Sequence, residues 1–398
     1  MRLEELPFVD VLGKEFQTDP YGAYSQALAE EEIGRCPFGA VVLGHQPIRE
    51  LLRDGRLTTP GELAAAMFGI TEGPFYSWWR GMLVSQSGPA HARLRRMVAA
   101  AFTAREADQS RPMMREILQE ILDDTSDQGE CDFATDIADL FTMRVLCRLI
   151  GVPVEDVPRF MRWVQDLGKG FSMNVDEDIA DLDSAVVGLS NYVEELIASR
   201  QRSDDLLQSL VDITDGGDRL THEELVSLVV LLLVAGYDTT SNQLSWGMLT
   251  FLEKPELWRR LVDDPSSAPL MVEELLRYRV SAAVSGRMAN EDVVYEGINY
   301  PAGTYFMVSF AAAGRDPRAF PDPETFDADR DGETHVSFGF GAHRCLGMHI
   351  ARTELEEAFT MLPRRLLNPR QSGIPEFGTP LGVHVVKSLP ISFNSETL

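Results

Sequence analysis

Residues Phe338 to Gly347 read FGFGAHRCLG and are followed at once by the helix-like segment MHIARTELEEAF. Its glycines let the backbone turn tightly and approach a flat ligand closely, and its two phenylalanines offer apolar cover for such a ligand. A cysteine just before a helix N-terminus gains from the helix dipole and from free N–H groups, which favour a thiolate. A thiolate iron ligand donates electrons and so favours O–O cleavage. The surroundings of Cys345 thus meet the needs of a thiolate ligand.

The alternative for this stretch is a glycine-rich turn around a buried free cysteine, which a Gly-Cys pair alone would favour. The complete spacing, however, resembles the haem-binding loop of the cytochrome P-450 family, F-G-x-G-x-H-x-C-x-G. Its fixed positions are filled here by Phe338, Gly339, Gly341, His343, Cys345 and Gly347. The resemblance implies that Cys345 is the axial iron ligand of a haem b. It also implies cofactor contacts for Phe338, Gly339, His343 and Gly347.

A second segment, MVEELLRYR, carries Glu274 and Arg277 at positions i and i+3, which lie on one face of a helix. An ordinary surface ion pair is one interpretation of this spacing. The motif E-x-x-R at this distance before the cysteine loop also resembles the family's buried Glu-Arg-Arg cluster, with Arg330 as the third member. The resemblance implies a structural role for the cluster.

A long helix is predicted to begin at Thr221, because Thr221 and Glu224 form a capping-box pattern, and to end at Lys254-Pro255. Such a helix has about 32 residues and is ~48 Å long at the standard rise. Its first half is apolar on every side, so we expect it to be buried.

The middle of this helix reads Ala-Gly-Tyr-Asp-Thr-Thr from Ala235. An aspartate in a buried apolar helix is costly unless it is paired or used. The segment resembles the family's oxygen-binding groove, A-G-x-[D/E]-T. The resemblance implies that Thr239 hydrogen-bonds the bound oxygen and that Asp238 relays protons to it. It also places Ala235 and Gly236 at the cofactor, and Asn242 beside the relay water.

The segment HARLRR at 91–96 resembles the family's haem-propionate helix. The resemblance implies propionate contacts for His91, Arg95, Arg287 and His343, since guanidinium and imidazolium groups pair well with carboxylates. A solvated helix face is the alternative for each of them. The chain departs from the family upstream, where Ser87, Gly88 and Ala90 replace the usual Asp-Pro-Pro-Glu.

The resemblance implies the cytochrome P-450 fold, mainly α with small β-sheets, and we expect residues 1–398 to form a single domain. Strands are predicted within 292–310 and 382–393, and a long ordered loop over Arg315 to Arg330. The predicted helices are Pro112 to Asp124, Ile137 to Ile150, Ala185 to Arg200, Pro255 to Leu261 and Leu270 to Arg279.

Charge and composition exclude several other classes of protein. The formal net charge of -26 makes nucleic-acid binding improbable, because phosphates would repel such a surface. The N-terminus lacks a signal-peptide pattern, and the longest apolar run, Val226 to Ala235, falls short of the ~20 residues that span a bilayer. We therefore expect no membrane association and a cytoplasmic protein. The four cysteines form neither a disulfide framework nor a zinc pair.

The expected activity is that of a haem-thiolate monooxygenase, with O2 as co-substrate and a hydrophobic small molecule as substrate. Electrons would come from NAD(P)H through a separate ferredoxin and ferredoxin reductase. Arginines could form the partner's docking surface, or could instead serve the haem or the fold: Arg93, Arg96, Arg344 and Arg352. Two other classes remain open, a peroxide-driven haem-thiolate peroxygenase and a non-catalytic haem-binding sensor or carrier.

The segment Pro60 to Val84 is unusually aromatic and apolar for a loop, and in the family this region covers the substrate. Its side chains and a few others either line a substrate pocket or pack in the core. The residues concerned are Leu63, Met67, Phe68, Trp78, Trp79, Phe171, Val234, Val284 and Leu381.

Overall fold

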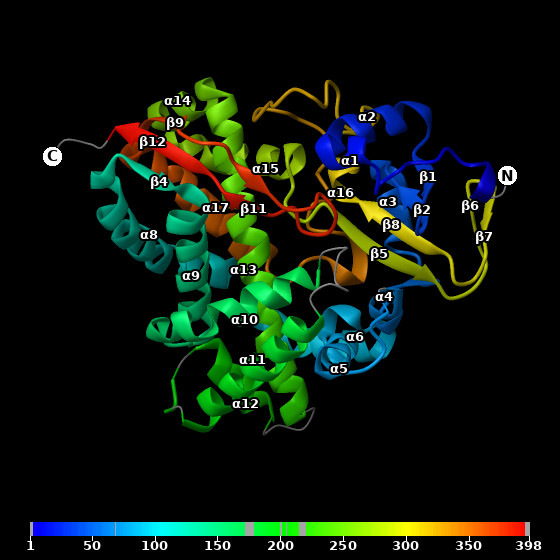
Figure 1. Ribbon diagram of the computed structural model, residues 1–398, viewed down its shortest axis with the longest axis horizontal. Helices are drawn as coiled ribbons and strands as arrows, with labels where there is room; N and C mark the ends of the chain where they lie inside the picture. Colours follow the sequence, from blue (N-terminus) through cyan, green and yellow to red (C-terminus); the bar gives the residue numbers. More distant parts are fainter. Residues whose placement is uncertain are drawn as a thin grey trace. The chain divides into compact units, whose positions relative to one another are not determined.

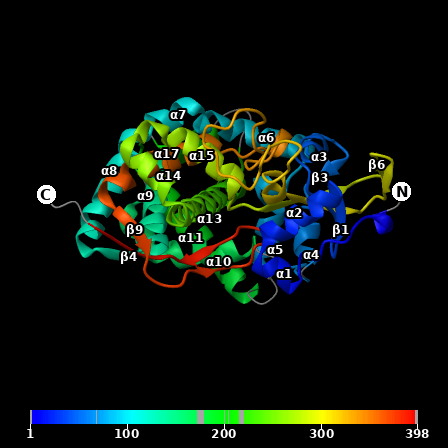
Figure 2. The same cartoon turned by 90° about the horizontal axis from the view of Figure 1, so that it is seen from above.

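The computed structural model describes residues 3–67, 69–171, 179–199, 201–203, 205–214 and 220–394. Helices predominate and the strands are short (Figures 1 and 2), so the predicted fold class is confirmed. The chain divides into two compact units. Unit 1 consists of Met1–Pro60, Leu270–Cys345 and Thr379–His384, and unit 2 of Gly61–Pro269, Leu346–Gly378 and Val385–Leu398.

Unit 1 contains a five-stranded sheet whose spatial order is β1-β2-β8-β5-β3. Strands β2 and β8 run parallel, with Ala40 opposite Phe306, and the other neighbours are antiparallel. A separate hairpin, β6-β7, turns through Glu296 and Gly297, which both have positive φ as a tight two-residue turn requires. The strands are β1 (Ile33–Cys36), β2 (Gly39–Val42), β3 (Leu57–Thr58), β5 (Val284–Ala289), β6 (Val293–Tyr295), β7 (Ile298–Tyr300) and β8 (Tyr305–Ser309).

The helices of unit 1 are short and lie mostly in its N-terminal segment. They are η1 (Leu3–Glu5), α1 (Lys14–Thr18), α2 (Pro20–Glu30), α3 (His45–Leu51), α15 (Ala268–Tyr278), α16 (Phe310–Ala313) and η9 (Gly341–His343). No helix or strand occurs among the described residues between α16 and η9, so the predicted long loop over Arg315 to Arg330 is confirmed.

Unit 2 is mainly helical. Its α-helices are α4 (Glu62–Met67), α5 (Pro74–Gly81), α6 (Gly88–Val98), α7 (Ala104–Gln109), α8 (Arg111–Thr125), α9 (Leu140–Ile150), α10 (Val157–Lys169), α11 (Ile179–Ser199), α12 (Leu206–Thr214), α13 (His222–Glu253), α14 (Pro255–Asp263) and α17 (Met348–Arg365). Its other helical turns are η2 (Leu83–Ser85), η3 (Ala99–Phe102), η4 (Ser126–Gln128), the π-helix η5 (Phe133–Asp139), η6 (Val154–Asp156) and η8 (Pro265–Ser267).

Two small sheets complete unit 2. The three-stranded one has the order β4-β12-β9 and the two-stranded one pairs β10 with β11. Their bounds are β4 (Glu130–Asp132), β9 (Leu367–Gln371), β10 (Glu376–Phe377), β11 (Val386–Ser388) and β12 (Pro390–Asn394).

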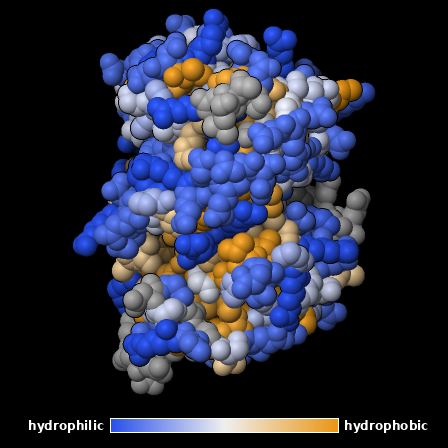
Figure 3. Space-filling view, turned by 90° about the vertical axis from the view of Figure 1, so that its left-hand side faces the viewer, coloured by the Kyte–Doolittle hydropathy of each residue, from blue (hydrophilic) through white to orange (hydrophobic). Residues whose placement is uncertain are grey.

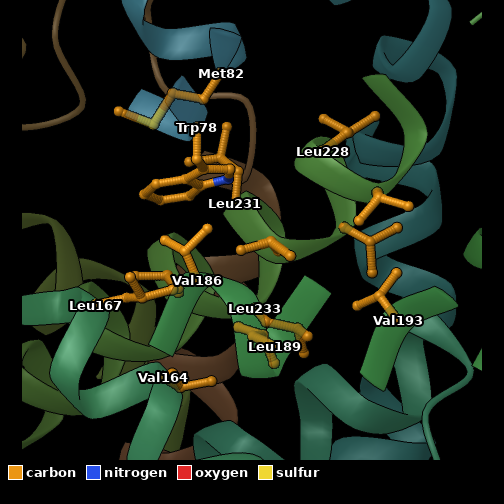
Figure 4. Close-up of a cluster of buried hydrophobic side chains, with 14 of the residues drawn as sticks. Trp78, Met82, Val164, Leu167, Val186, Leu189, Val193, Leu228, Leu231 and Leu233 are labelled. Carbon is orange, nitrogen blue, oxygen red and sulfur yellow. The ribbon is translucent and has the colours of Figure 1, made fainter. Parts of the chain in front are cut away.

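Helix α13 is the centre of unit 2. It spans 32 residues, His222–Glu253, and begins with the predicted capping box, in which Thr221 and Glu224 each bond the other's backbone N–H. Helices α9, α10, α11 and α17 pack against it. Figure 4 shows side chains of α5, α10, α11 and α13 meeting in one apolar cluster, among them Trp78, Val164 and Leu231. The predicted burial of the first half of the helix is therefore confirmed.

Helix α17, which follows the cysteine loop in the chain, is fastened to α8 by ion pairs. The buried carboxylate of Glu357 accepts from Arg111 at 2.8 Å and from Arg115 at 2.5 Å. Glu356 binds Arg111 as well, at 2.6 Å. Because two guanidinium groups surround one buried carboxylate, the charge of Glu357 is compensated where water is excluded.

Three expectations about secondary structure need correction. Strands β1 to β5, β9 and β10 are not among the predicted ones, because each has six residues or fewer and because β2, β3 and β4 pair with segments far away in the chain. The segment Pro60 to Val84 is not a loop, since it contains α4 and α5. The helix expected from Ile137 begins as the π-helix η5 and becomes α-helical only at Leu140.

The expectation about membrane spans also changes, since α13 is long and apolar enough by length and composition to cross a bilayer. Within unit 2, however, 61% of its most apolar window is buried. A core helix of a globular protein has the same properties, so α13 is no evidence for a membrane protein. Figure 3 shows mainly hydrophilic residues on the face that it draws, with hydrophobic ones in small patches.

Replacing Thr221 with alanine removes the side-chain cap of α13. We expect Thr221→Ala to lower the free energy of unfolding by about 1 kcal/mol, seen as a lower urea midpoint. Thr71→Ala is the matched control, because Thr71 is exposed and has no hydrogen bond within the described part of the chain. Equal midpoints for the two variants would contradict a stabilising role of the cap.

Candidate active site

The Cys345 side chain is exposed, and its loop is fixed by backbone hydrogen bonds of unit 1. The Cys345 N–H donates to the Phe338 carbonyl at 2.7 Å, and the Gly339 N–H donates to the Val336 carbonyl at 2.7 Å. The chain's other cysteines are more buried, and burial raises the pKa of the Cys131 and Cys147 thiols to about 12. Cys345 is therefore the most exposed of the chain's cysteines.

Gly339 and Gly341 make the tight turns that the sequence predicted for this loop. Gly339 and Gly341 adopt φ of 69° and 70°, and a Cβ on Gly341 would lie 2.5 Å from the Leu52 carbonyl oxygen at the end of α3. The Phe340 ring packs beneath the Arg53 guanidinium of the same unit, 4.4 Å from its centroid. The structure thus assigns Phe340 to holding the loop, where the sequence predicted cover for a ligand.

The Glu274–Arg277–Arg330 cluster lies in unit 1, as the spacing predicted. Glu274 and Arg277 are buried and form a two-pronged pair at 2.6 and 2.7 Å, and Arg330 lies 3.5 Å from the same carboxylate. Arg277 also donates to the Gly314 carbonyl at 2.6 Å and to others in the long loop. The Asp327 N–H donates to Glu274 at 2.8 Å. The cluster therefore ties α15 to the long loop, and the surface ion-pair interpretation is wrong.

On α13, the predicted groove is a break in the buried surface of the helix. Ala235 is exposed, and Gly236, Asp238 and Thr239 are half-buried, although most of the helix is buried. The Thr239 hydroxyl donates to the Ala235 carbonyl at 2.8 Å, a backward bond typical of threonine in helices. Gly236 faces α9, where an added Cβ would lie 2.9 Å from a methyl of Leu146. Its small size therefore lets the two helices approach.

Asn242 of the same helix holds Asp238 by hydrogen bonds, and strand β11 in turn holds Asn242. The Asn242 side-chain amide donates to the Asp238 carbonyl at 2.6 Å and to its carboxylate at 3.1 Å. The Val386 N–H donates to the Asn242 amide oxygen at 2.7 Å. Asn242 thus contacts Asp238 directly, where the sequence placed it beside a water.

The environment of Asp238 favours a protonated carboxyl. Burial raises its pKa to about 7, helped by the neighbouring charge of Asp139, while the Asn242 hydrogen bond lowers it. Burial also raises the pKa of Asp139 to about 6. Sequence reasoning missed Asp139, because nothing in residues 133–139 predicts contact with a helix that begins more than eighty positions later.

The residues expected at haem propionates fall in both units. In unit 2, His91 is buried on α6 and Arg95 lies one turn later, half-buried. In unit 1, His343 is half-buried in η9, and Arg287 is buried on β5. Burial lowers the pKa of Arg287 to about 10, and its hydrogen bonds go to the Ser285 hydroxyl and the Gly286 carbonyl. Among the described residues, this buried cation has no carboxylate partner.

The expected pocket residues divide into several groups. Trp78 and Val234 belong to the apolar core of unit 2, so core packing holds for them. Trp79 is half-buried and stacks obliquely on Phe171 at 5.2 Å. The others differ widely: Leu63 and Met67 are exposed, Val284 is half-buried, Leu381 is buried, and Phe68 lies outside the described residues.

Comparison with known proteins decides the family. The family model described as Cytochrome P-450 matches residues 40–265 and 268–374, which is most of the chain. The chain belongs to the cytochrome P-450 family. It is accordingly an oxidoreductase of the monooxygenase type, and the family implies a haem cofactor and the use of O2.

The similarity to individual members covers nearly the whole length of this cytochrome P-450. It is 36% identical over 381 residues to the mycinamicin IV hydroxylase/epoxidase of Micromonospora griseorubida, covering 93% of this chain and 92% of that one. It is 33% identical over 398 residues to the luteothin monooxygenase of Streptomyces thioluteus, covering 98% and 97%. The crystal structure of CalO2 superposes with a TM-score of 0.90 at 28% identity, covering 97% and 98%.

The residues present fit a haem. Unit 1 offers an exposed thiol on a glycine-shaped loop, and a buried Arg287 whose charge lacks a carboxylate among the described residues. A propionate would supply that carboxylate. Unit 2 offers the exposed Ala235 in the middle of a buried helix, where a flat apolar ligand can lie against the backbone.

Removing the negative charge of Glu274 leaves Arg277 buried without its partner. We expect Glu274→Gln to destabilise the protein by about 3–5 kcal/mol, with a lower thermal midpoint. Glu273→Gln is the matched control, because Glu273 is the adjacent residue, its side chain is 42% exposed and it pairs with His335 at 3.3 Å. A Glu274→Gln midpoint no lower than that of the control would show that the cluster does not hold the long loop.

Proposed function

We propose that this protein is a haem-thiolate monooxygenase that inserts one oxygen atom from O2 into a hydrophobic small molecule by hydroxylation or epoxidation. The observation that carries the proposal is the exposed break in α13, where Thr239 stands beside a carboxyl whose pKa is about 7. An acid that is part protonated at neutral pH can give up a proton and recover it, as O2 reduction requires.

Cys345 would bind the iron through its sulfur, and the bound haem would supply the activation of O2 and the transfer of its oxygen atom. Arg287, His91, Arg95 and His343 would bind its propionates. The remaining contacts would come from Ala235, Gly236, Phe338, Gly339 and Gly347. Each of these assignments rests on the family's motif and on the exposure or burial described above.

The chain's own contribution to the reaction is proton handling. The Asp238 carboxyl would release a proton toward the Thr239 hydroxyl and take one back from solvent. Asn242 would keep that carboxyl in place through its bonds to Asp238 and Val386. Because Asp238 loses its proton as the pH rises through about 7, we expect delivery to weaken above that pH.

Electrons would come from NAD(P)H through a separate ferredoxin reductase and ferredoxin in the cytoplasm. Of the arginines considered for docking, Arg93 forms an ion pair with Glu224 of the α13 capping box, which supports a role in the fold. Arg96 and Arg344 are exposed and Arg352 is half-buried, so they remain candidates. We also propose that the chain is a single catalytic domain, because the family match includes residues of both units.

A hydrophobic substrate is supported by half-buried apolar side chains in both units, Trp79 and Phe171 in unit 2 and Val284 in unit 1. The names of the relatives point to different molecules, a mycinamicin, luteothin and vitamin D(3). We propose the class alone, a terpenoid, steroid, fatty acid or polyketide. Screening such compounds for a spin-state change of the haem would identify the members that bind.

One experiment, in which the reaction is reconstituted with either hydrogen peroxide or the redox partners, distinguishes the monooxygenase from two other functions. A peroxygenase would form product with hydrogen peroxide and gain nothing from NADH and ferredoxin. The Asp238–Thr239 pair instead favours a reaction that depends on NADH and ferredoxin. A haem sensor or carrier would form no oxidised product under either condition. The expected result is product with NADH, ferredoxin and reductase, at a rate above that of the peroxide reaction.

Replacing the sulfur of Cys345 with oxygen removes the thiolate. We expect Cys345→Ser to abolish the red-shifted carbon monoxide band of the reduced haem protein, because that band reports a thiolate ligand. Cys147→Ser, a substitution at a buried cysteine of α9, should retain the band. An unchanged band in Cys345→Ser would overturn the assignment of the ligand.

Removing the Thr239 hydroxyl should uncouple electron transfer from product formation. We expect Thr239→Ala to bind substrate with the unchanged spin-state change but to divert most of its electrons into peroxide or water. Product per NADH should fall severalfold. A rise of about 1–2 kcal/mol in the barrier of the coupled reaction has this effect, since about 1.4 kcal/mol corresponds to a tenfold change in rate. Thr239→Ser, which keeps the hydroxyl, should recover coupling; full coupling in Thr239→Ala would remove Thr239 from proton delivery.

A further inference from the structure

Helix α5 of unit 2 is too short to be stable by itself. It has eight residues, Pro74–Gly81, whereas isolated helices shorter than ~12 residues are marginal in water. Its N-cap residue, Gly73, has no side chain that could accept from the first turn, and Pro74 at the first position has no N–H. The order of α5 therefore depends on groups that other parts of unit 2 supply.

Asp183 of helix α11 supplies the cap that α5 lacks. Its Oδ1 accepts from the Phe75 N–H at 2.8 Å, across 108 positions of the chain. Gly73 makes this approach possible, because an added Cβ would lie 2.9 Å from the Asp183 Oδ2 and because its φ is 103°. A carboxylate at a helix N-terminus accepts from an otherwise unbonded N–H and interacts favourably with the helix dipole. Asp183 thus joins the first turn of α5 to α11.

The capped turn carries aromatic rings that contact the end of α10. Phe75 and Trp79 are four residues apart on one face of α5, and their ring centroids lie 5.4 Å apart. The Trp79 ring also lies 5.2 Å from the ring of Phe171, and a Cβ added to Gly170 would lie 2.9 Å from the Phe75 ring. A movement of the first turn of α5 away from Asp183 would therefore change the packing of Trp79 on Phe171.

Other contacts of α5 act further along the helix. The Trp79 indole N–H donates to the Gly61 carbonyl at 3.0 Å, and that of Trp78 donates to the Ser227 carbonyl at 3.4 Å. Figure 4 shows Trp78 in the apolar cluster with side chains of α11. These contacts hold the middle of α5, whereas the bond from Asp183 holds its first turn.

We propose that Asp183 is a positioning residue for the substrate pocket: by capping α5 from α11, it keeps Trp79 packed on Phe171 where the substrate would lie. The proposal rests on the monooxygenase function proposed above, in which these two half-buried rings support a hydrophobic substrate. Rings of this size bind through the apolar area that they bury. Asp183 should therefore matter for ligands with a large apolar body and not for small ligands of the iron.

The first readout is hydrogen–deuterium exchange of the amides of α5 in the purified holoprotein. Asp183→Ala should speed this exchange about fivefold, because loss of a cap makes local opening of a helix easier. Asp183→Asn keeps an oxygen that can accept from the Phe75 N–H, so it should exchange at close to the wild-type rate. Asp181→Ala is the matched control, because Asp181 is exposed in the same turn of α11. It should leave the exchange of α5 unchanged.

The second readout compares the binding of two probes, econazole and imidazole, by the shift of the haem absorption band. Both bind haem iron through a nitrogen atom, but only econazole carries a large apolar body. Asp183→Ala should weaken econazole binding severalfold, because the arrangement that binds it is populated for a smaller fraction of the time. Imidazole binding should be unchanged, and Asp183→Asn should restore the affinity for econazole.

Three results would count against these assignments. Exchange of α5 at the wild-type rate in Asp183→Ala overturns the role of the cap. Faster exchange without a loss of econazole affinity, or with an equal loss for imidazole, overturns the positioning role. A wild-type holoprotein that binds imidazole but not econazole would instead contradict the apolar pocket of the proposed function.

Discussion

A charged side chain that is buried loses its hydration and must either find an opposite charge or become neutral. Helix α17 shows both outcomes within one turn. Glu357 is buried with Arg111 and Arg115 around it and can remain ionised. Glu354 is buried too, but its Oε2 has no hydrogen-bond partner within the described residues, and burial raises its pKa well above the usual value. A buried carboxyl here is either paired with arginine or neutral.

The presence or absence of an oppositely charged partner also distinguishes residues that hold the fold from residues of the candidate site. In unit 1, Glu274 is fully compensated by Arg277 and Arg330, and it holds the long loop that leads to the cysteine segment. In unit 2, Asp238 accepts a hydrogen bond from Asn242 and no cation of the described chain acts on it, and burial raises its pKa to about 7. Arg287 presents the opposite case, a buried cation whose hydrogen bonds go to the Ser285 hydroxyl and the Gly286 carbonyl. Paired charges such as Glu274 build the fold, whereas Asp238 and Arg287 lack an oppositely charged partner among the described residues.

Much of this was predictable from sequence where the signal is local. The capping box at Thr221 and the Lys254-Pro255 stop predicted both ends of α13, because caps act within one turn. The glycines of the cysteine loop predicted tight turns, and Gly339 and Gly341 have them. What escaped prediction depends on distant pairing. Strand β8 lies in a region where a strand was predicted, but its parallel partner β2 precedes it by more than two hundred positions and is only four residues long.

The candidate site shows the same division. Asp238, Thr239 and Cys345 stand in motifs, so each could be named from the sequence. Asp139 could not, because it comes near α13 only through the packing of η5 on that helix. The pKa of Asp238 depends on burial, which no motif specifies.

In the proposed holoprotein, the sulfur of Cys345 binds the haem iron. X-ray absorption spectroscopy of the purified ferric protein tests it most directly, since it identifies the atoms bound to iron. The structure leads us to expect one sulfur neighbour, which disappears in Cys345→Ser. An iron with only nitrogen and oxygen neighbours in the unaltered protein would contradict the claim.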